Sequence, residues 1–209
     1  MAIIKQGILG GFKKKIGSVV GSSWKGVATM RSLPLSVANP RTAAQVENRD
    51  RFKACAEFAS LILASIIKPL MDRFAGQMSG YNYFTKLNKE VWANPLLPTW
   101  SDLVISKGRM VAPTVTASTT GGDEIVLSLP AVQGDRFASP TDVLYVLIYN
   151  ATQEKIVLQG ATAYKRSDRT ATLSDLDDMA TNDKIKIYVA YLRADGSEVS
   201  NSGYVEITA

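Results

Sequence analysis

The feature that most constrains the fold is a change of hydrophobic period near residue 100. From residue 102 onward, apolar side chains recur at every second position in short runs rich in β-branched and aromatic residues, a pattern typical of strands. We expect strands in these runs: Leu103–Ser106, Thr114–Ser118, Glu124–Leu129, Val143–Asn150, Lys155–Gln159, Ala161–Arg166, Thr170–Leu173, Lys184–Leu192 and Gly203–Thr208.

No helical period separates these runs. Short strands divided by turn residues, about seven of them in a stretch of this length, favour an antiparallel β-sandwich of the immunoglobulin or fibronectin type III kind over residues 102–209. With 46% apolar and 21% charged residues, the chain has the composition of a globular protein.

Before residue 94 the period is helical. Thr42 with Gln45 three residues later predicts a helix start with a capping box. Steps of three and four then place apolar residues on one stripe, and Pro69 is expected to end or kink the helix near Ile67. The stripe consists of Phe52, Cys55, Ala59, Ile62 and Ile66, widened by Leu61, Leu63, Ile67 and Leu70.

A second, short helix is expected after Ser79, a favourable N-cap residue. Its apolar positions are Tyr81, Phe84, Leu87 and Val91. We expect the aromatic residues there, Tyr81, Tyr83, Phe84 and Trp92, to pack in a core or interface rather than to form a ligand platform. The helical segment is thus 41–93, and the proline-containing stretch 94–101 is predicted to be a linker.

Residues 1–40 are too rich in glycine for a stable helix and predict a β-hairpin or extended arm. Its two β-prone pieces are Ile16–Val20 and Gly26–Leu33. An isolated hairpin is marginal in water, so its apolar side chains need a surface to lie on. We therefore expect four arm residues to contact a partner protein, namely Val20, Trp24, Val27 and Met30.

Positive charge is concentrated at the same end. The net charge is +5, yet residues 1–42 hold seven bases and no acid, which leaves 17 bases against 19 acids elsewhere. Nucleic acid or an acidic neighbouring subunit would suit such an arm. The candidate phosphate contacts are Lys13, Lys14, Lys15, Lys25 and Arg31, with Trp24 available for stacking; the alternative is a solvated or protein-contacting face. The sequence contains no G-x-x-x-x-G-K-[ST] motif, so we do not expect nucleotide binding.

Enzymatic chemistry is poorly provided for. Histidine is absent and Cys55 is the only cysteine, which excludes histidine-dependent triads and multi-cysteine metal sites. We expect Cys55 to be a small buried residue, and Asp175–Asp178 to be a polar corner rather than a calcium loop. No catalytic residue, metal site, cofactor or small-molecule substrate is predicted.

The sequence shows no pattern that predicts a secretory signal or a membrane span. The first residues do not resemble a secretory leader, and the longest apolar run, Phe58–Ile67, has ten residues, about half a membrane span. We expect a soluble protein, made in the cytoplasm and without a membrane partner.

Several N-terminal motifs resemble those of an uncharacterised domain-of-unknown-function family of bacterial proteins, many of them encoded in or near prophages. The motifs are Gly17–Gly26 (GSVVGSSWKG), Met30–Pro34 (MRSLP), Asn39–Gln45 (NPRTAAQ), Arg49, Arg51–Phe52, Met78–Asn82 (MSGYN) and Ser106–Gly108 (SKG). The order of basic opening, N-P-x-T-x-x-Q motif, helix and sandwich is more loosely similar to proteins of phage virion gene clusters. Lys13–Lys15 departs from the Gly-Lys pair of many relatives.

The expected protein is therefore α+β: a basic N-terminal hairpin or arm, a helical segment and an immunoglobulin-like sandwich. The expected function is non-enzymatic: a structural or assembly protein, of a phage or phage-like virion, that forms a homo-oligomer or larger assembly through the arm. The alternative is a nucleic-acid-binding or packaged protein. A glycan- or cell-surface-binding module would rest on fold analogy alone.

Overall fold

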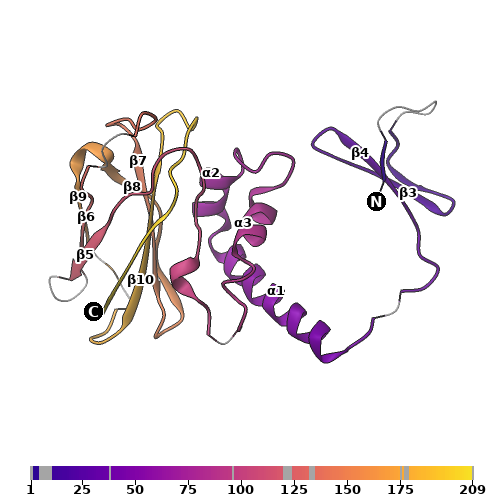
Figure 1. The fold of residues 1–209 in the computed structure, drawn as a ribbon, viewed down its shortest axis with the longest axis horizontal. Helices are drawn as coiled ribbons and strands as arrows, with labels where there is room; N and C mark the ends of the chain where they lie inside the picture. Colours follow the sequence, from indigo (N-terminus) through magenta and orange to yellow (C-terminus); the bar gives the residue numbers. More distant parts are fainter. Residues whose placement is uncertain are drawn as a thin grey trace. The chain divides into compact units, whose positions relative to one another are not determined.

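The structure is a computed structural model that describes residues 2–4, 11–37, 39–95, 97–119, 124–131, 135–174, 176 and 179–208. The predicted polar corner at Asp175, Asp177 and Asp178 lies outside these residues. Within the described residues, helices and three antiparallel sheets make the protein α+β (Figure 1). The chain divides into two compact units, Met1–Glu47 and Asn48–Ala209.

The first unit is a small antiparallel sheet in the order β1-β4-β3-β2. Its strands are β1 (Ala2–Ile4), β2 (Lys14–Ile16), β3 (Val19–Trp24) and β4 (Val27–Ser32). The β3–β4 turn has positive φ at both Lys25 (44°) and Gly26 (81°), as a two-residue type I′ hairpin requires. The expected strand Ile16–Val20 is wrong, because Gly17 (φ 58°) begins a turn that separates β2 from β3.

The long helix begins as predicted and breaks earlier than predicted. Helix α1 is Ala43–Leu61, and the Thr42 backbone N–H donates to Gln45 Oε1 at 3.4 Å, which is one half of the capping box. A π-turn, η1 (Leu63–Ile67), and helix α2 (Lys68–Met71) follow at an angle of 70° to α1. Pro69 lacks an N–H and its ring would clash with the carbonyl four residues earlier, so the chain widens before it.

The predicted apolar stripe is buried in its second half and exposed at its start. Cys55, Ala59, Ile62 and Ile66 are buried, but the side chain of Phe52 is 58% exposed. Leu61 is likewise exposed, so its expected place in the widened stripe is wrong, whereas Ile67 and Leu70 are buried. The first turns of α1 are exposed and take no part in the core.

Helix α3 (Gly80–Asn88) has the predicted cap: Ser79 Oγ accepts a hydrogen bond from the Asn82 backbone N–H at 3.2 Å. Phe84 and Trp92 are buried, and Tyr81 and Tyr83 pack against the same core, so these aromatic residues are packing residues as expected. Among the described residues, no single helix is long and apolar enough to span a membrane, although α1 and Leu63–Met71 together satisfy both criteria as a bent pair.

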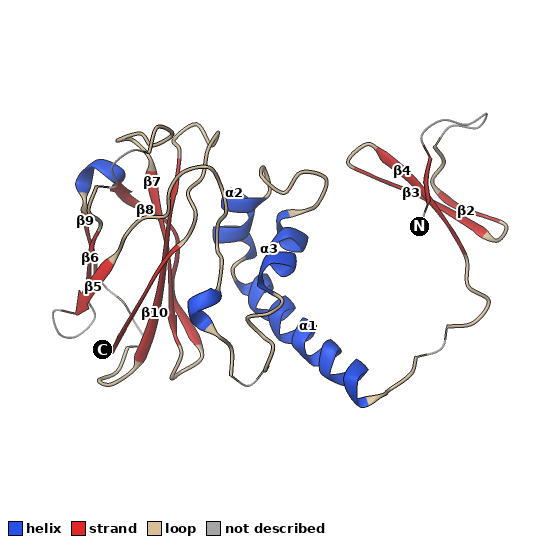
Figure 2. Ribbon diagram, viewed as in Figure 1, coloured by secondary structure: helices blue, strands red, loops and turns tan. Residues whose placement is uncertain are grey.

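The described residues of the C-terminal region include seven strands in two sheets. Figure 2 shows these strands in red. One sheet has the order β5-β6-β9 and the other the order β11-β10-β7-β8. Three strands facing four in this order make an immunoglobulin-like sandwich. The strands are β5 (Thr116–Thr119), β6 (Ile125–Ser128), β7 (Val143–Asn150), β8 (Lys155–Lys165), β9 (Thr170–Leu173), β10 (Lys184–Leu192) and β11 (Gly203–Thr208).

Three of the strands expected in this region differ from the structure. The predicted pair Lys155–Gln159 and Ala161–Arg166 is one strand, β8, which continues through Gly160 (φ 129°). Leu103–Ser106 is not a strand, although Leu103 and Ile105 are both buried as alternating residues would be.

The four-stranded sheet is covered on both faces. Alternate residues of β7 and β10, such as Leu147 and Tyr188, pack against α1–α3, while Val146 and Ile187 pack against the other sheet. Figure 1 shows the helices on one side of β7, β8 and β10, and β5, β6 and β9 on the other. Residues 48–208 thus form three layers with two apolar cores.

Residues 94–101, predicted to be a linker, lie inside the second unit. The ring of Trp100, in the short helix η2 (Trp100–Asp102), lies 4.6 Å from that of Tyr149 and 5.6 Å from that of Phe58, measured between centroids. The Trp100 carbonyl also accepts a hydrogen bond from the Tyr188 hydroxyl at 2.7 Å. These contacts join the helical segment to the sandwich.

Candidate functional site

The register of the N-terminal sheet decides which side chains share a face. Val20 lies opposite Arg31 on β4 and Lys15 on β2, and Trp24 lies opposite Val27. Because side chains alternate along a strand and paired residues share a face, these five side chains lie on one face of the sheet. We call this surface, formed by Lys15, Val20, Trp24, Val27 and Arg31, the Trp24 face.

The opposite face is partly covered by the unit's own chain, although Met30 on it is 37% exposed. A Cβ atom added to Gly21 would overlap the ring and carbonyl of Phe12, and one added to Gly11 would lie 2.7 Å from the Cβ atom of Ala28. Gly11–Phe12 therefore lies across β3 and β4 on this side, and glycine is required at both close approaches. We call this side the Phe12 face.

The four predicted partner residues do not all lie together. Val20, Trp24 and Val27 are on the Trp24 face, whereas Met30 lies opposite Gly21 and so belongs to the Phe12 face. The Trp24 side chain is 58% exposed, and Val20 and Val27 are half-buried. Within residues 11–37 only Gly21 is buried, so this part of the sheet has no apolar core.

The five predicted phosphate contacts are all exposed but are distributed over the unit. Lys15 and Arg31 flank Val20 on the Trp24 face, Lys14 lies opposite Gly21, and Lys25 is in the turn beside Trp24. Lys13 precedes β2. The Trp24 face is consequently an apolar centre with a cation on each side of Val20.

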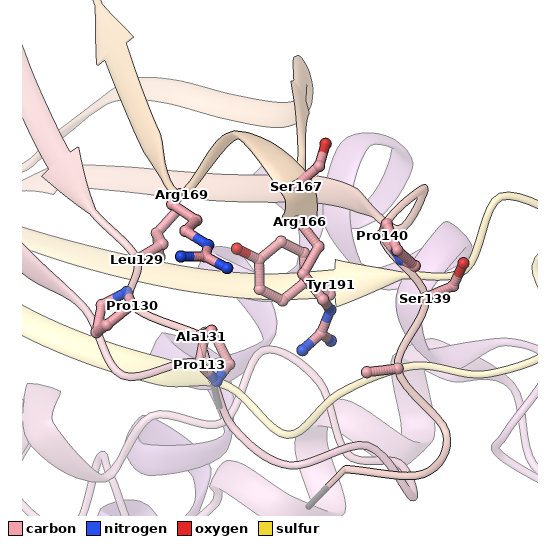
Figure 3. A pocket seen from close by; sticks show the side chains of 11 residues that line it. Pro113, Leu129, Pro130, Ala131, Ser139, Pro140, Arg166, Ser167, Arg169 and Tyr191 are labelled. Carbon is pink, nitrogen blue, oxygen red and sulfur yellow. The ribbon is translucent and has the colours of Figure 1, made fainter. Parts of the chain in front are cut away.

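A separate pocket of about 380 Å³ lies in the sandwich (Figure 3). Loops next to β5, β6, β7 and β9 form its walls, together with a side chain of β10. Its apolar lining is Pro113, Leu129, Pro130, Ala131, Ala138 and Pro140. Its polar lining is Ser139, Arg166, Ser167, Arg169 and Tyr191.

Arg166 is fixed in the pocket wall. Its Nε donates to Asp142 Oδ2 at 3.0 Å, and Asp142 is completely buried. The guanidinium also lies over the Tyr191 ring, 4.1 Å from its centroid, a cation–π arrangement. Burial raises the pKa of the Tyr191 hydroxyl, so this phenol stays neutral, with its proton available to donate.

Arg169 follows the short helix η3 (Arg166–Asp168) and has a left-handed backbone (φ 55°). Hydrogen bonds from the Lys165 backbone N–H and the Ser167 hydroxyl hold the pKa of Asp168 below its usual value. The Asp168 carboxylate thus faces its own turn. Arg169 has no ion-pair partner among the described residues. No sequence pattern identified this pocket, since its residues come from distant loops.

Cys55 is buried, as predicted, and its surroundings disfavour the thiolate. Burial raises its pKa to about 11, and a hydrogen bond with Thr85 offsets only part of that effect. Within the described ranges, His, Cys, Asp and Glu residues form no group of three that could hold a metal ion.

The family model of a family of unknown function, DUF6266, matches residues 11–206. The chain belongs to this family. The match spans nearly all of both units of this DUF6266 protein and confirms the resemblance to an uncharacterised family that the N-terminal motifs indicated. A search of curated proteins found no match.

Two solved structures are similar to parts of the DUF6266 chain. The rat CD45 extracellular region, domains d3–d4, is 7% identical with a TM-score of 0.35, over 48% of this chain and 51% of that one. A DUF3244 protein with an immunoglobulin-like β-sandwich fold, from Bacteroides vulgatus, is 15% identical with a TM-score of 0.26, over 46% of this chain and 84% of that one. The chain thus spans about half the CD45 fragment, and likenesses this remote carry no argument about function.

Proposed function

We propose that this protein is a non-enzymatic structural protein that assembles through the Trp24 face of its N-terminal sheet. The observation that carries the proposal is the asymmetry of that sheet. Gly11 and Phe12 partly cover its Phe12 face, where Met30 is 37% exposed, whereas its Trp24 face presents a 58% exposed indole beside Val20 and Val27.

Apolar area is the driving force for such a contact. Because residues 11–37 contain no buried apolar side chain, this part of the sheet gains little stability from its own side chains and needs packing against another surface. Tryptophan and arginine are the residue types that most often dominate binding energy at protein interfaces, and the Trp24 face contains one of each.

A second copy of this chain is the proposed partner. Residues 1–42 carry seven bases and no acid, while the remainder has an excess of two acids, so the basic sheet of one copy and the rest of another attract each other. Such complementarity mainly raises the association rate and orients the encounter. The Trp24 face then supplies the buried contact.

The mass of the full-length chain in sedimentation experiments over a wide concentration range tests the proposal. We expect concentration-dependent association, weakened at least about tenfold by Trp24→Ser because an interface tryptophan commonly contributes about 2 kcal/mol or more. Met30→Ser is the matched control, since Met30 lies on the Phe12 face of the same strand pair. Equal weakening by both variants, or no association of the wild type, would contradict the proposal.

Nucleic-acid binding is the second candidate function. The row Lys15–Val20–Arg31 beside Trp24 offers two cations and an aromatic ring on one face, a combination suited to a single strand. If it bound nucleic acid with about six phosphate contacts, affinity would fall on the order of a thousandfold between roughly 50 and 200 mM salt. A filter-binding titration that finds no affinity at low salt would eliminate this candidate.

The proposed setting is a phage or phage-like particle, with synthesis in the cytoplasm. Its support is the order of the N-terminal motifs, which is similar to that in proteins of phage virion gene clusters. Purified particles from a host strain that encodes the chain would contain it in many copies. Its absence from such particles would leave the assembly proposal in place without this setting.

A further inference from the structure

We propose that the pocket around Arg166, Arg169 and Tyr191 binds a carboxylate carried on a small apolar body. This inference is independent of the N-terminal sheet, because all lining residues belong to the second unit. A peptide C-terminus and a small apolar carboxylic acid share this chemistry, and the experiment below distinguishes them.

Charge selects an anion. The charge of Arg166 is balanced by the buried Asp142, with which it forms an ion pair whose two side chains are 14% and 0% exposed. Arg169, which is exposed, contributes a second positive charge and forms no ion pair with an acid among the described residues. The pocket therefore carries a net charge near +1, held at Arg169.

Geometry favours a planar carboxylate. Guanidinium groups donate two parallel hydrogen bonds to a carboxylate, and the Ser139 hydroxyl and the Tyr191 phenol lie in the same lining. Figure 3 shows the Arg166, Arg169 and Tyr191 side chains gathered at the pocket. The remaining wall is proline, alanine and leucine, which suits an apolar body and leaves a highly hydrated ion without partners.

The walls are preorganised. Backbone hydrogen bonds join Leu129 N–H to the Arg169 carbonyl at 2.7 Å, Arg166 N–H to the Asp142 carbonyl at 2.9 Å, and Ser167 N–H to the Pro140 carbonyl at 3.1 Å. Three of the lining residues are prolines, whose backbones have little freedom to lose. Few protein groups lose conformational freedom when a ligand binds, so the entropic cost of binding is low. The volume of about 380 Å³ lies at the small end of ligand sites and limits the body to a few residues.

Amide chemical-shift titrations of the full chain test this site. The probes are acetyl-Ala-Pro-Leu with a free carboxylate, the same peptide with a C-terminal amide, and 4-methylpentanoate as the small acid. We expect shifts at Leu129, Ser167 and Tyr191, with the free acid bound at least about tenfold more tightly than the amide, the factor of one charge-assisted interaction. If the peptide acid binds more tightly than 4-methylpentanoate the source is a peptide end, and the reverse order indicates a small molecule.

Substitutions then locate the charge. Arg169→Gln should weaken binding of the free acid about tenfold and leave the amide unchanged, and Arg169→Lys should retain part of the affinity. Arg136→Gln removes an exposed arginine outside the lining and should have little effect. The proposal would be overturned if acid and amide bind equally, or if Arg169→Gln and Arg136→Gln lose the same affinity. It would also be overturned if no probe causes shifts at about 10 mM, a concentration above the dissociation constants typical of specific sites.

Discussion

The side-chain amide of Asn88 pairs with both backbone groups of Val104. Asn88 Oδ1 accepts from the Val104 N–H at 2.7 Å, and Asn88 Nδ2 donates to the Val104 carbonyl at 2.9 Å and to the Phe84 carbonyl at 3.0 Å. Asn88 is completely buried at the end of α3. One side chain thus takes the place of a neighbouring strand for the extended segment around Val104.

We predict that Asn88→Ala lowers the free energy of unfolding by about 2 kcal/mol, because it leaves the partly buried Val104 N–H and carbonyl without their partner. Urea unfolding followed by circular dichroism measures the change. Asn48→Ala, at an exposed position of α1, should alter stability by less than about 0.5 kcal/mol. A loss below about 1 kcal/mol for Asn88→Ala would show that water replaces the amide.

The close approach of Phe12 to Gly21 leads to a second prediction. Gly21→Ala should loosen the N-terminal sheet, because the added methyl group overlaps the Phe12 ring and carbonyl. Amide hydrogen exchange in β3 and β4 should accelerate in this variant. Adding Phe12→Ala should return the exchange rates only part of the way to wild type, because it removes the overlapping ring but keeps the overlapping backbone carbonyl of residue 12. Ser23→Ala, two residues along β3, is the control. Unchanged exchange in Gly21→Ala would mean that Phe12 does not cover this face.

The seven-stranded sandwich was predictable because β-branched and aromatic residues alternate along its strands. Strands β7 and β10 are buried on both faces, and their β-branched and aromatic residues also predicted strands. Leu103–Ser106 shows the limit of that pattern. Its alternation is genuine, but its Val104 backbone pairs with the Asn88 amide, and no local pattern reveals this side-chain partner.

The candidate sites were predictable to different degrees. Trp24, Val20 and Val27 could be selected as apolar residues of a glycine-rich arm. The exclusion of Met30 from their face depends on strand register, which Gly17 and the Lys25–Gly26 turn determine together. The Arg169 pocket left no sequence signal, because loops that are far apart in the chain supply its wall.

Cys55 gives a prediction about pH. Its raised pKa, about 11, means that the thiol is protonated throughout the neutral range in the folded protein. Native protein at about pH 8 should therefore react with a thiol reagent far more slowly than denatured protein, since the thiolate is the reacting species. Since the folded pKa exceeds the unfolded value, the associated stability is complete below about pH 9 and lost as the pH rises toward about 11. Rapid labelling of native protein at pH 8 would contradict the burial of this thiol.

We propose that the Trp24 face of the N-terminal sheet is covered in an assembly of this chain. Limited trypsin digestion tests it directly, because Lys15, Lys25 and Arg31 are exposed cleavage sites on or beside this face. The rate of cleavage at these three residues is compared between dilute monomer and concentrated assembly. We predict rapid cleavage in the monomer and strong protection in the assembly; equal rates in the two would contradict the claim.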